Sequence, residues 1–170
     1  FLNNLFIGSM NGMYIYNIDE PTAPRQMSIF EHVRACDPVV TDGEYAYVTL
    51  RDGTECQGFN NQLDVVDIAD LKKPSLVKTY PLHHPIGLSI VDDLLFICED
   101  DQGLKIFDAT DVKAIDKHLL NHDRRFQATD VIVLPDPKLA IITGTDGIYQ
   151  LDYTDPTNLK ILSSFKPTKP

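Results

Sequence analysis

The chain repeats one short pattern of apolar and polar positions. At Leu63–Asp67, apolar side chains lie among polar neighbours, β-branched residues are frequent, and an acidic residue closes the run. This pattern predicts a β-strand with one or both faces buried, ended by a turn. Runs of the same shape occur at Met13–Asn17, Leu104–Asp108 and Ile148–Asp152.

The repeat has a long period. The four runs end at Asn17, Asp67, Asp108 and Asp152, so successive runs are 50, 41 and 44 residues apart. Spacings of this size are typical of β-propeller blades and other repeat units. A second β-rich run precedes each of the four, and a glycine-bearing or longer turn lies between the two: these runs are Asn4–Ser9, Tyr45–Leu50, Leu94–Cys98 and Leu139–Thr143.

Two further kinds of strand complete the predicted unit. An acidic residue three places after each run, often with prolines, indicates a turn. A weaker strand is expected after that turn, at Arg25–Phe30, Leu76–Tyr80, about Ala114–Leu119, and Lys160–Phe165. Sparsely charged runs between the units are predicted as innermost strands, which lie at the crowded centre of a propeller: Asp37–Thr41, Ile86–Val91 and Thr129–Leu134.

These elements predict an all-β fold, a β-propeller of about four antiparallel four-stranded blades. The units run approximately over 1–30, 37–80, 86–119 and 128–165, followed by a tail at 166–170. The first unit lacks its inner strand, and an open sheet edge would leave backbone groups unpaired. We therefore expect either that residues upstream of Phe1 supply that strand or that the chain is part of a larger ring. A closed four-bladed ring with one short blade is the least favoured arrangement.

The repeated strand also resembles a known family. Leu63–Asp67 and Leu104–Asp108 match a Leu-x-Val/Ile-x-Asp pattern, and the segment 35–56 resembles the better-kept stretch of the same repeat. In these features the chain is similar to the LVIVD-repeat β-propellers of Bacteroidetes-type bacteria. The resemblance implies a secreted or surface-tethered protein with a lipid anchor upstream of Phe1, and it brings no catalytic residues.

Charge narrows the classes of partner. The 170 residues include 15 Lys and Arg against 25 Asp and Glu, a formal net charge of −10. Such a chain is repelled by phosphate backbones and anionic lipid, so a nucleic acid is not expected as a ligand. No apolar run is long enough to span a bilayer. The sequence starts without Met, inside a predicted unit and without a signal peptide, so we expect a mature product or a fragment. The expectation of an extracytoplasmic compartment comes from the family resemblance alone.

Three cysteines raise the question of a disulfide. Cys36 precedes a predicted inner strand and Cys56 follows the neighbouring antiparallel strand, so the two thiols are expected within bonding reach. The bond would contribute about 3 kcal/mol in the chain-entropy model. The alternative is a pair of reduced thiols in a cytosolic protein. Cys98 ends a predicted buried strand, where we expect a free core thiol.

The connectivity predicts one face that collects the polar loops. Turns between second and third strands and connections between units all belong to this face, where ligands of propellers usually bind. Its predicted partner-binding residues are Arg51, Asp52, Asn60, His83, His84, Glu99, Asp100, Asp101 and Asp146, and neighbouring loop residues include Glu31, His122, Arg124 and Arg125. A solvated acidic rim without a ligand is the alternative interpretation.

Metal and catalytic chemistry have weaker support. A structural Ca²⁺ held by Asp37 and Asp130 is one hypothesis, although the sequence contains no EF-hand pattern; otherwise no cofactor is expected. Recognised nucleophile, phosphate-loop and zinc-protease motifs are also missing. The leading hypothesis is therefore a non-enzymatic module that binds a protein partner or a larger assembly through the loop face. The alternative is a glycan-binding protein or hydrolase with an acidic channel-mouth site.

Overall fold

The computed structural model describes residues 2–31, 38–53 and 60–167, and their regular structure is almost entirely β. One short 3-10 helix, η1 (Ile115–Lys117), accompanies the strands. Within these ranges, no helix has the length and apolar character needed to cross a membrane. The strands are β1 (Asn4–Ser9), β2 (Gly12–Asn17), β3 (Arg25–Glu31), β4 (Val39–Thr41), β5 (Tyr45–Leu50), β6 (Gln62–Asp67), β7 (Ser75–Pro81), β8 (Leu88–Val91), β9 (Leu94–Cys98), β10 (Leu104–Asp108), β11 (Leu119–Asp123), β12 (Asp130–Leu134), β13 (Leu139–Gly144), β14 (Gly147–Asp152) and β15 (Lys160–Phe165).

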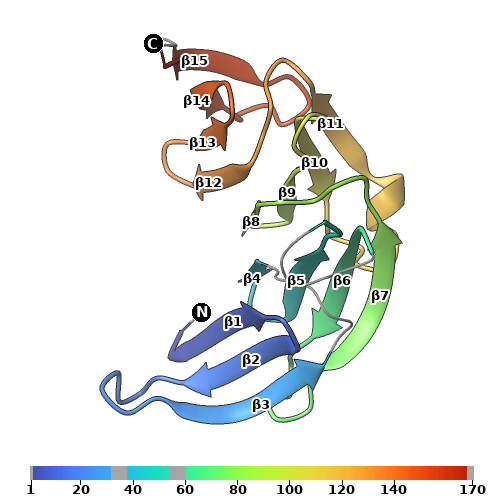
Figure 1. Cartoon of the computed structure of the whole chain (residues 1–170), viewed down its shortest axis with the longest axis vertical. Helices are drawn as coiled ribbons and strands as arrows, with labels where there is room; N and C mark the ends of the chain where they lie inside the picture. Colours follow the sequence, from blue (N-terminus) through green and yellow to red (C-terminus); the bar gives the residue numbers. More distant parts are fainter. Residues whose placement is uncertain (1, 32–37, 54–59, 168–170) are drawn as a thin grey trace. The chain divides into compact units, whose positions relative to one another are not determined.

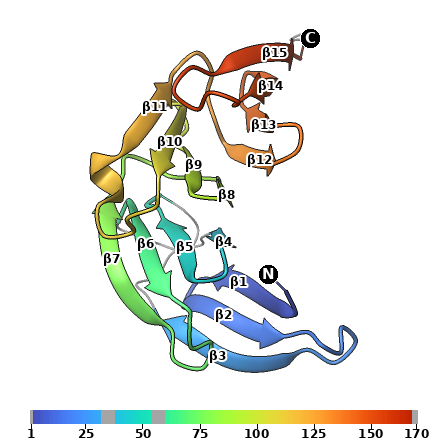
Figure 2. The same cartoon turned by 180° about the vertical axis from the view of Figure 1, so that it is seen from behind.

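The strands form four antiparallel sheets in which each strand pairs with its neighbours in sequence. The orders are β1-β2-β3, β4-β5-β6-β7, β8-β9-β10-β11 and β12-β13-β14-β15 (Figures 1 and 2). The predicted three-stranded first unit and the three four-stranded units are confirmed. Each repeated run is the third strand of its unit, or the second where the inner strand is missing.

The chain divides into two compact units, Phe1–His84 and Pro85–Pro170, and each contains two sheets. In the first unit, Met13 and Ile15 of the β1–β3 sheet pack with Val48 and Val66 of the β4–β7 sheet. In the second unit, side chains of β9 and β10 pack with those of β12 to β14: the buried cluster includes Phe96, Leu104, Ile106, Val131, Ala140, Ile142, Tyr149 and Leu151. Each core thus lies between two neighbouring sheets.

The turns that follow the repeated strands are alike because acidic side chains at the strand ends form the same local hydrogen bonds. The carboxylates of Asp67, Asp108 and Asp152 accept hydrogen bonds from the backbone N–H two residues on, at 2.8–2.9 Å. The acidic residues three positions later do the same at 2.9–3.0 Å: Asp70, Asp111 and Asp155. Each of these three repeats therefore leaves its strand through two successive Asx turns, which satisfy backbone donors that the sheet no longer pairs.

Because carboxylates accept the hydrogen bonds of these turns, we expect the protein to lose stability in acid. Hydrogen bonds from Thr110 and Thr154 lower the pKa of Asp108 and of Asp152 below the ordinary 3.8. A lowered folded-state pKa stabilises the protein above the unfolded pKa, and this contribution is lost as the pH falls through the folded value. We expect the melting temperature to fall as the pH drops below about 4, and to fall less steeply in Asp108→Asn, which keeps an acceptor that does not titrate in this range. Thermal unfolding followed by circular dichroism across this pH range measures the difference; equal slopes would contradict the assignment.

The predicted fourth strand of the third unit was wrong in position. The sequence indicated a strand at about Ala114–Leu119, whereas the structure has η1 there and places β11 at Leu119–Asp123. Burial explains the shift, because the helical turn brings Ile115 into the interior at 1% exposure. As a result the unit extends to Asp123, and His122 is a strand residue instead of a loop residue.

Candidate functional site

The candidate site surrounds the connection between β11 and β12, residues 124–129, in the second unit. Asp100 and Ala128 join this connection to the turn between β9 and β10 by two backbone hydrogen bonds of 3.0 Å. In this unit the strand-to-strand turn and the connection between sheets therefore lie side by side, as the predicted loop face requires. Two backbone links hold the loops without help from side chains.

A buried ion pair stabilises the β9–β10 turn. Glu99 is fully buried and forms an ion pair with Lys105, whose side chain is 20% exposed. A buried carboxylate next to a lysine ammonium offsets part of the desolvation cost of both charges. Glu99 was predicted to be a partner-binding residue, but the structure places it in the interior, where its interaction with Lys105 supports the turn.

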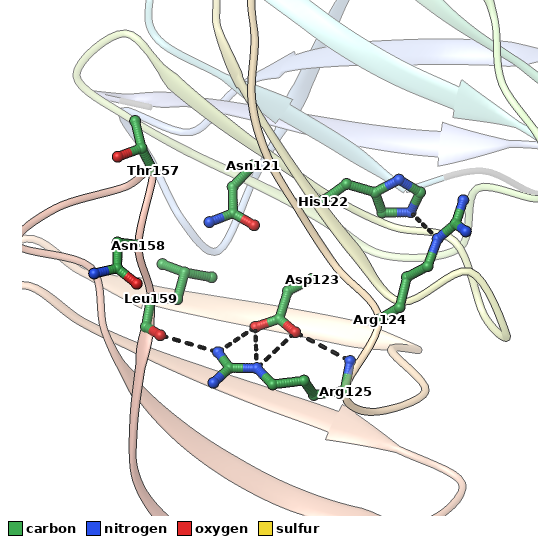
Figure 3. Close-up of a pocket in the computed structure, with 8 residues that line it drawn as sticks. All are labelled: Asn121, His122, Asp123, Arg124, Arg125, Thr157, Asn158 and Leu159. Carbon is green, nitrogen blue, oxygen red and sulfur yellow. Dashed lines mark hydrogen bonds and ion pairs between the residues drawn. The ribbon is translucent and has the colours of Figure 1, made fainter.

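A second ion pair fixes the start of the β11–β12 connection. Asp123 is 6% exposed and accepts hydrogen bonds from Arg125 Nε at 2.9 Å and Nη2 at 2.6 Å. The same guanidinium also donates to the carbonyl oxygen of Leu159 at 2.9 Å, and Figure 3 shows it between these two acceptors. The hydrogen bond to Asp123 raises the pKa of Arg125. Arg125, which keeps its positive charge, thus links the end of β11 to the turn before β15.

The side chain of Arg124 points away from the Asp123–Arg125 pair (Figure 3). Its Nε donates to His122 Nε2 at 3.2 Å, and within the part of the chain that the structure describes no partner is seen for its two terminal nitrogens (Figure 3). His122 Nε2 also lies 2.8 Å from the carbonyl oxygen of Gln102, a contact that needs a proton on that nitrogen. The two contacts of Nε2 exclude each other, because one needs an acceptor and the other a donor. The imidazole tautomer therefore decides whether His122 holds Arg124 or the β9–β10 turn.

Two polar hollows meet at Arg124 and Arg125. One, of about 520 Å³, is lined by the end of β11, the start of the β11–β12 connection and the turn before β15: Asn121, His122, Asp123, Arg124, Arg125, Thr157, Asn158 and Leu159. The other, of about 470 Å³, we call the Arg124 hollow. It is lined by Asp101, Arg124, Arg125, Phe126, Gln127, Thr145 and Asp146. The Arg124 hollow combines two guanidinium groups, two carboxylates, an amide and a hydroxyl, so its wall both donates and accepts hydrogen bonds.

Asp146 has a defined orientation in the Arg124 hollow. Its Oδ2 accepts a hydrogen bond from the hydroxyl of buried Tyr149, while its Oδ1 is shielded from solvent without a hydrogen-bond partner among the described residues. Burial, and then the hydrogen bond to Asp146, raise the pKa of Tyr149. The phenol therefore stays protonated and donates to the carboxylate. Oδ1 is thus a buried acceptor with unused hydrogen-bonding capacity.

The predicted residues of the first unit have contacts within that unit. His84 Nε2 lies 3.9 Å from Asp52 Oδ1, and the backbone N–H of Asp52 donates to Asn61 Oδ1 at 3.2 Å. Arg51 is half-buried at the end of β5, while Asn60 and His83 are exposed. Of the predicted partner-binding residues, Asp101 and Asp146 line the Arg124 hollow, and Asp100 positions it through its backbone. The neighbouring loop residues Arg124 and Arg125 line it too. The supporting residues Lys105 and Tyr149 carried no loop signal in the sequence because they lie on strands.

The predicted metal and disulfide residues fall largely outside the described residues. Cys36, Cys56 and Asp37 lie in the ranges that the structure leaves undescribed, so their pairing and ligation stay predictions. Asp130 is exposed and accepts a hydrogen bond from the backbone N–H of Val131 at 2.9 Å. Within the described ranges, no group of three or more His, Cys, Asp or Glu could hold a metal ion. Cys98 is buried and free, and burial raises the pKa of its thiol, as expected for a core cysteine.

Solved structures decide the fold. The chain superposes on a periplasmic gluconolactonase of Pseudomonas aeruginosa with a TM-score of 0.73, at 13% identity and over 98% of this chain. It superposes on the β-propeller domain of Swd1 from Myceliophteria thermophila with a TM-score of 0.68, at 14% identity and over 97% of this chain. The fold is a β-propeller. The four sheets are its blades, which we number 1 to 4 in chain order.

The remaining comparisons show how far the similarity to known proteins extends. A protein of unknown function from Desulfotomaculum acetoxidans matches the chain with a TM-score of 0.70 at 15% identity. The chain spans 55% of the gluconolactonase, 55% of the Swd1 propeller and 53% of the Desulfotomaculum protein, so it corresponds to about half of each. No protein-family model and no curated protein matches the sequence. At these identities the likeness shows the propeller fold alone.

Proposed function

We propose that this chain is a binding module, part of a larger β-propeller, and that it recognises a protein partner at the Arg124 hollow. One observation carries the proposal: the exposed guanidinium of Arg124 stands on a loop that two backbone hydrogen bonds and the Asp123–Arg125 pair hold in place. Arginines presented on rigid scaffolds are frequent anchors of protein interfaces. Asp101 and Asp146 lie in the same hollow and supply acceptors for donors of the partner.

The charge of the chain favours a basic partner. A formal net charge of −10 attracts cationic proteins over long range and speeds their association. Arg124 then contributes local specificity, because it requires an acceptor group at one point of an otherwise cationic surface.

Reversing the charge of Arg124 is expected to abolish capture of the partner. Immobilised wild-type protein is incubated with an extract of the source organism, and the retained proteins are identified by mass spectrometry. Arg124→Glu should lose the specific partner, with affinity reduced about 100-fold or more, as for a typical interface anchor. Lys117→Glu, an equal change of charge on exposed η1 in the same unit, serves as the control and should retain it. Equal capture by all three proteins would reject the Arg124 hollow as the binding site.

A sugar derivative is the second candidate ligand of the same hollow. Two solved structures similar to this chain are named as a periplasmic gluconolactonase and a putative 6-phosphogluconolactonase, the latter from Bacteroides uniformis with a TM-score of 0.67. The mixed donors and acceptors of Arg124, Gln127, Thr145 and the two carboxylates suit hydroxyl groups. Calorimetry with gluconate and 6-phosphogluconate, and pH-stat assays with the lactones, test this candidate. Absence of binding and of hydrolysis would exclude it.

We further propose that the chain belongs among the LVIVD-repeat propellers and works outside the cytoplasm. The Leu-x-Val/Ile-x-Asp strands β6 and β10 support this assignment, and a lipid anchor upstream of Phe1 would tether the protein. A Cys36–Cys56 disulfide would fit an oxidising compartment. Intact-mass measurement after alkylation without and with reduction tests the bond: two extra alkylated thiols after reduction are expected. Alkylation of both thiols before reduction would contradict it.

A further inference from the structure

One ring nitrogen of His122 serves two neighbours. His122 is half-buried on β11 and pairs in register with Lys105 of β10. Its Nε2 lies 2.8 Å from the carbonyl oxygen of Gln102 in the β9–β10 turn. The same atom lies 3.2 Å from Nε of Arg124, on the β11–β12 connection (Figure 3). Because strand pairing fixes the backbone of His122, its ring stays within reach of both groups.

The protons on the imidazole decide which neighbour is bound. When Nδ1 carries the only proton, Nε2 has a lone pair that accepts the hydrogen bond from Arg124. When the ring is charged, both nitrogens carry protons, so Nε2 can only donate, and the carbonyl oxygen of Gln102 is the acceptor within reach. Protonation of His122 and its hydrogen bond from Arg124 therefore exclude each other. Histidine ordinarily gains its charge between about pH 8 and pH 5.

The charges around His122 act in the same direction. The charged groups on the neighbouring elements are Lys105 with its partner Glu99, Asp100 and Asp101 of the β9–β10 turn, and Asp123 with its partner Arg125. The turn before β15 adds the uncharged Thr157 and Asn158. Among the described residues, Arg124 is the cation within hydrogen-bonding distance of the ring. A proton on the ring thus removes the acceptor of Arg124 and places a second positive charge beside it, and like charges repel.

The released guanidinium has other acceptors in the Arg124 hollow. The carboxylates of Asp101 and Asp146 line the same hollow and attract it. Arg124 is exposed, so its side chain has room to change rotamer once Nε is free. A guanidinium that is mobile, or bound to a carboxylate of its own chain, is less available to a partner than one held by His122.

We propose that His122 makes partner binding at the Arg124 hollow sensitive to pH, an inference that rests on the proposed function. The neutral ring holds Arg124 through Nε and presents its two terminal nitrogens to an acceptor of the partner. The charged ring releases Arg124. Ordering a long side chain on binding costs free energy, so the affinity for the partner is expected to fall about 3- to 10-fold between about pH 7.5 and pH 5.5.

NMR spectroscopy of the full chain tests the exchange without a partner. The Nε–Hε signal of Arg124, assigned with Arg124→Lys, should shift with the same midpoint as the ring nitrogens of His122. The Arg125 signal is the internal reference, because its acceptor is the carboxylate of Asp123 and not an imidazole. In His122→Gln the Arg124 signal should no longer follow a histidine titration. His118→Gln changes an exposed histidine of the same unit and should leave the titration intact.

Capture at two pH values tests the consequence for binding. The probe is the set of proteins from an extract of the source organism that wild type retains and Arg124→Glu loses. Other groups in the extract also titrate, so retention by wild type is divided by retention by His122→Gln at each pH. This ratio should fall by the same factor between about pH 7.5 and pH 5.5. His118→Gln should behave as wild type, and far-UV circular dichroism verifies that the variants fold.

Three outcomes would overturn the proposal. The first is an Arg124 signal that stays still while the His122 ring titrates, which decides the matter in wild type even if His122→Gln does not fold. The second is an Arg124 signal that still titrates in His122→Gln. The third is a retention ratio that does not change with pH. Failure of the proposed function is distinguishable, because Arg124→Glu then retains the same proteins as wild type, whereas the NMR titration needs no partner.

Discussion

Replacing Lys105 with methionine is expected to lower the free energy of unfolding by about 3–5 kcal/mol, the usual cost of breaking a buried ion pair from one side. Methionine keeps the aliphatic stem of the lysine but removes the ammonium beside Glu99, which is fully buried. The carboxylate then loses the charge that offsets its desolvation. Because Glu99 begins the turn that carries Asp100 and Asp101, the same change should loosen the loop next to the Arg124 hollow.

The double variant Glu99→Met with Lys105→Met separates the charge from the packing. An apolar pair of similar volume is expected to restore stability to within about 1 kcal/mol of wild type. Lys117→Met, on exposed η1, controls for the loss of a positive charge and should change stability by less than about 0.5 kcal/mol. Urea unfolding of the four proteins gives the comparison. A double variant less stable than the Lys105 variant would show that Glu99 stabilises the turn without its cation.

Replacing Gly103 with alanine should be nearly as damaging. Gly103 has a φ of +81°, and a Cβ added there would lie 2.1 Å from the carbonyl oxygen of Asp123. The strained backbone and the overlap with a backbone atom together predict a loss of about 2–4 kcal/mol. The overlap falls where β10 and β11 pair, so relief requires moving the strand that carries Asp123 and the start of the β11–β12 connection.

Gly53 offers a matched control for the backbone term. Its φ is +69°, but nothing lies within 4 Å of an added Cβ, so Gly53→Ala carries only the conformational cost of about 1 kcal/mol. The difference in the free energy of unfolding between the two variants, from thermal and urea unfolding, measures the cost of the steric overlap at Gly103. Equal losses would mean that β11 moves aside freely and that the turn does not restrain it.

The repeated aspartates show which features of the fold can be predicted from the sequence. Asp67, Asp108 and Asp152 were recognisable as strand ends because the turn depends on contacts only two residues along the chain. Local chemistry of this kind is readable from sequence. The fourth strand of the third blade was misplaced for the opposite reason: the position of β11 depends on Ile115 reaching a core formed by residues distant in sequence.

The candidate site shows the same division. The loop face could be predicted, since antiparallel connectivity alone places turns and connections at one edge of each sheet. The roles of individual residues could not. Glu99 and Asp101 are two positions apart and both acidic, yet one is fully buried beside Lys105 and the other lines a hollow with Arg124. Sequence distance does not reveal which carboxylate a neighbouring strand covers.

By itself, then, the sequence determined the all-β architecture, the number and order of the blades, and the turns that end them, because alternation and Asx chemistry act over a few residues. Only the tertiary structure decided that Arg125 is bound by Asp123 while Arg124 faces the hollow. The physical reason is that burial and charge pairing are set by which strands become neighbours. Such neighbours are brought together by packing across the whole unit.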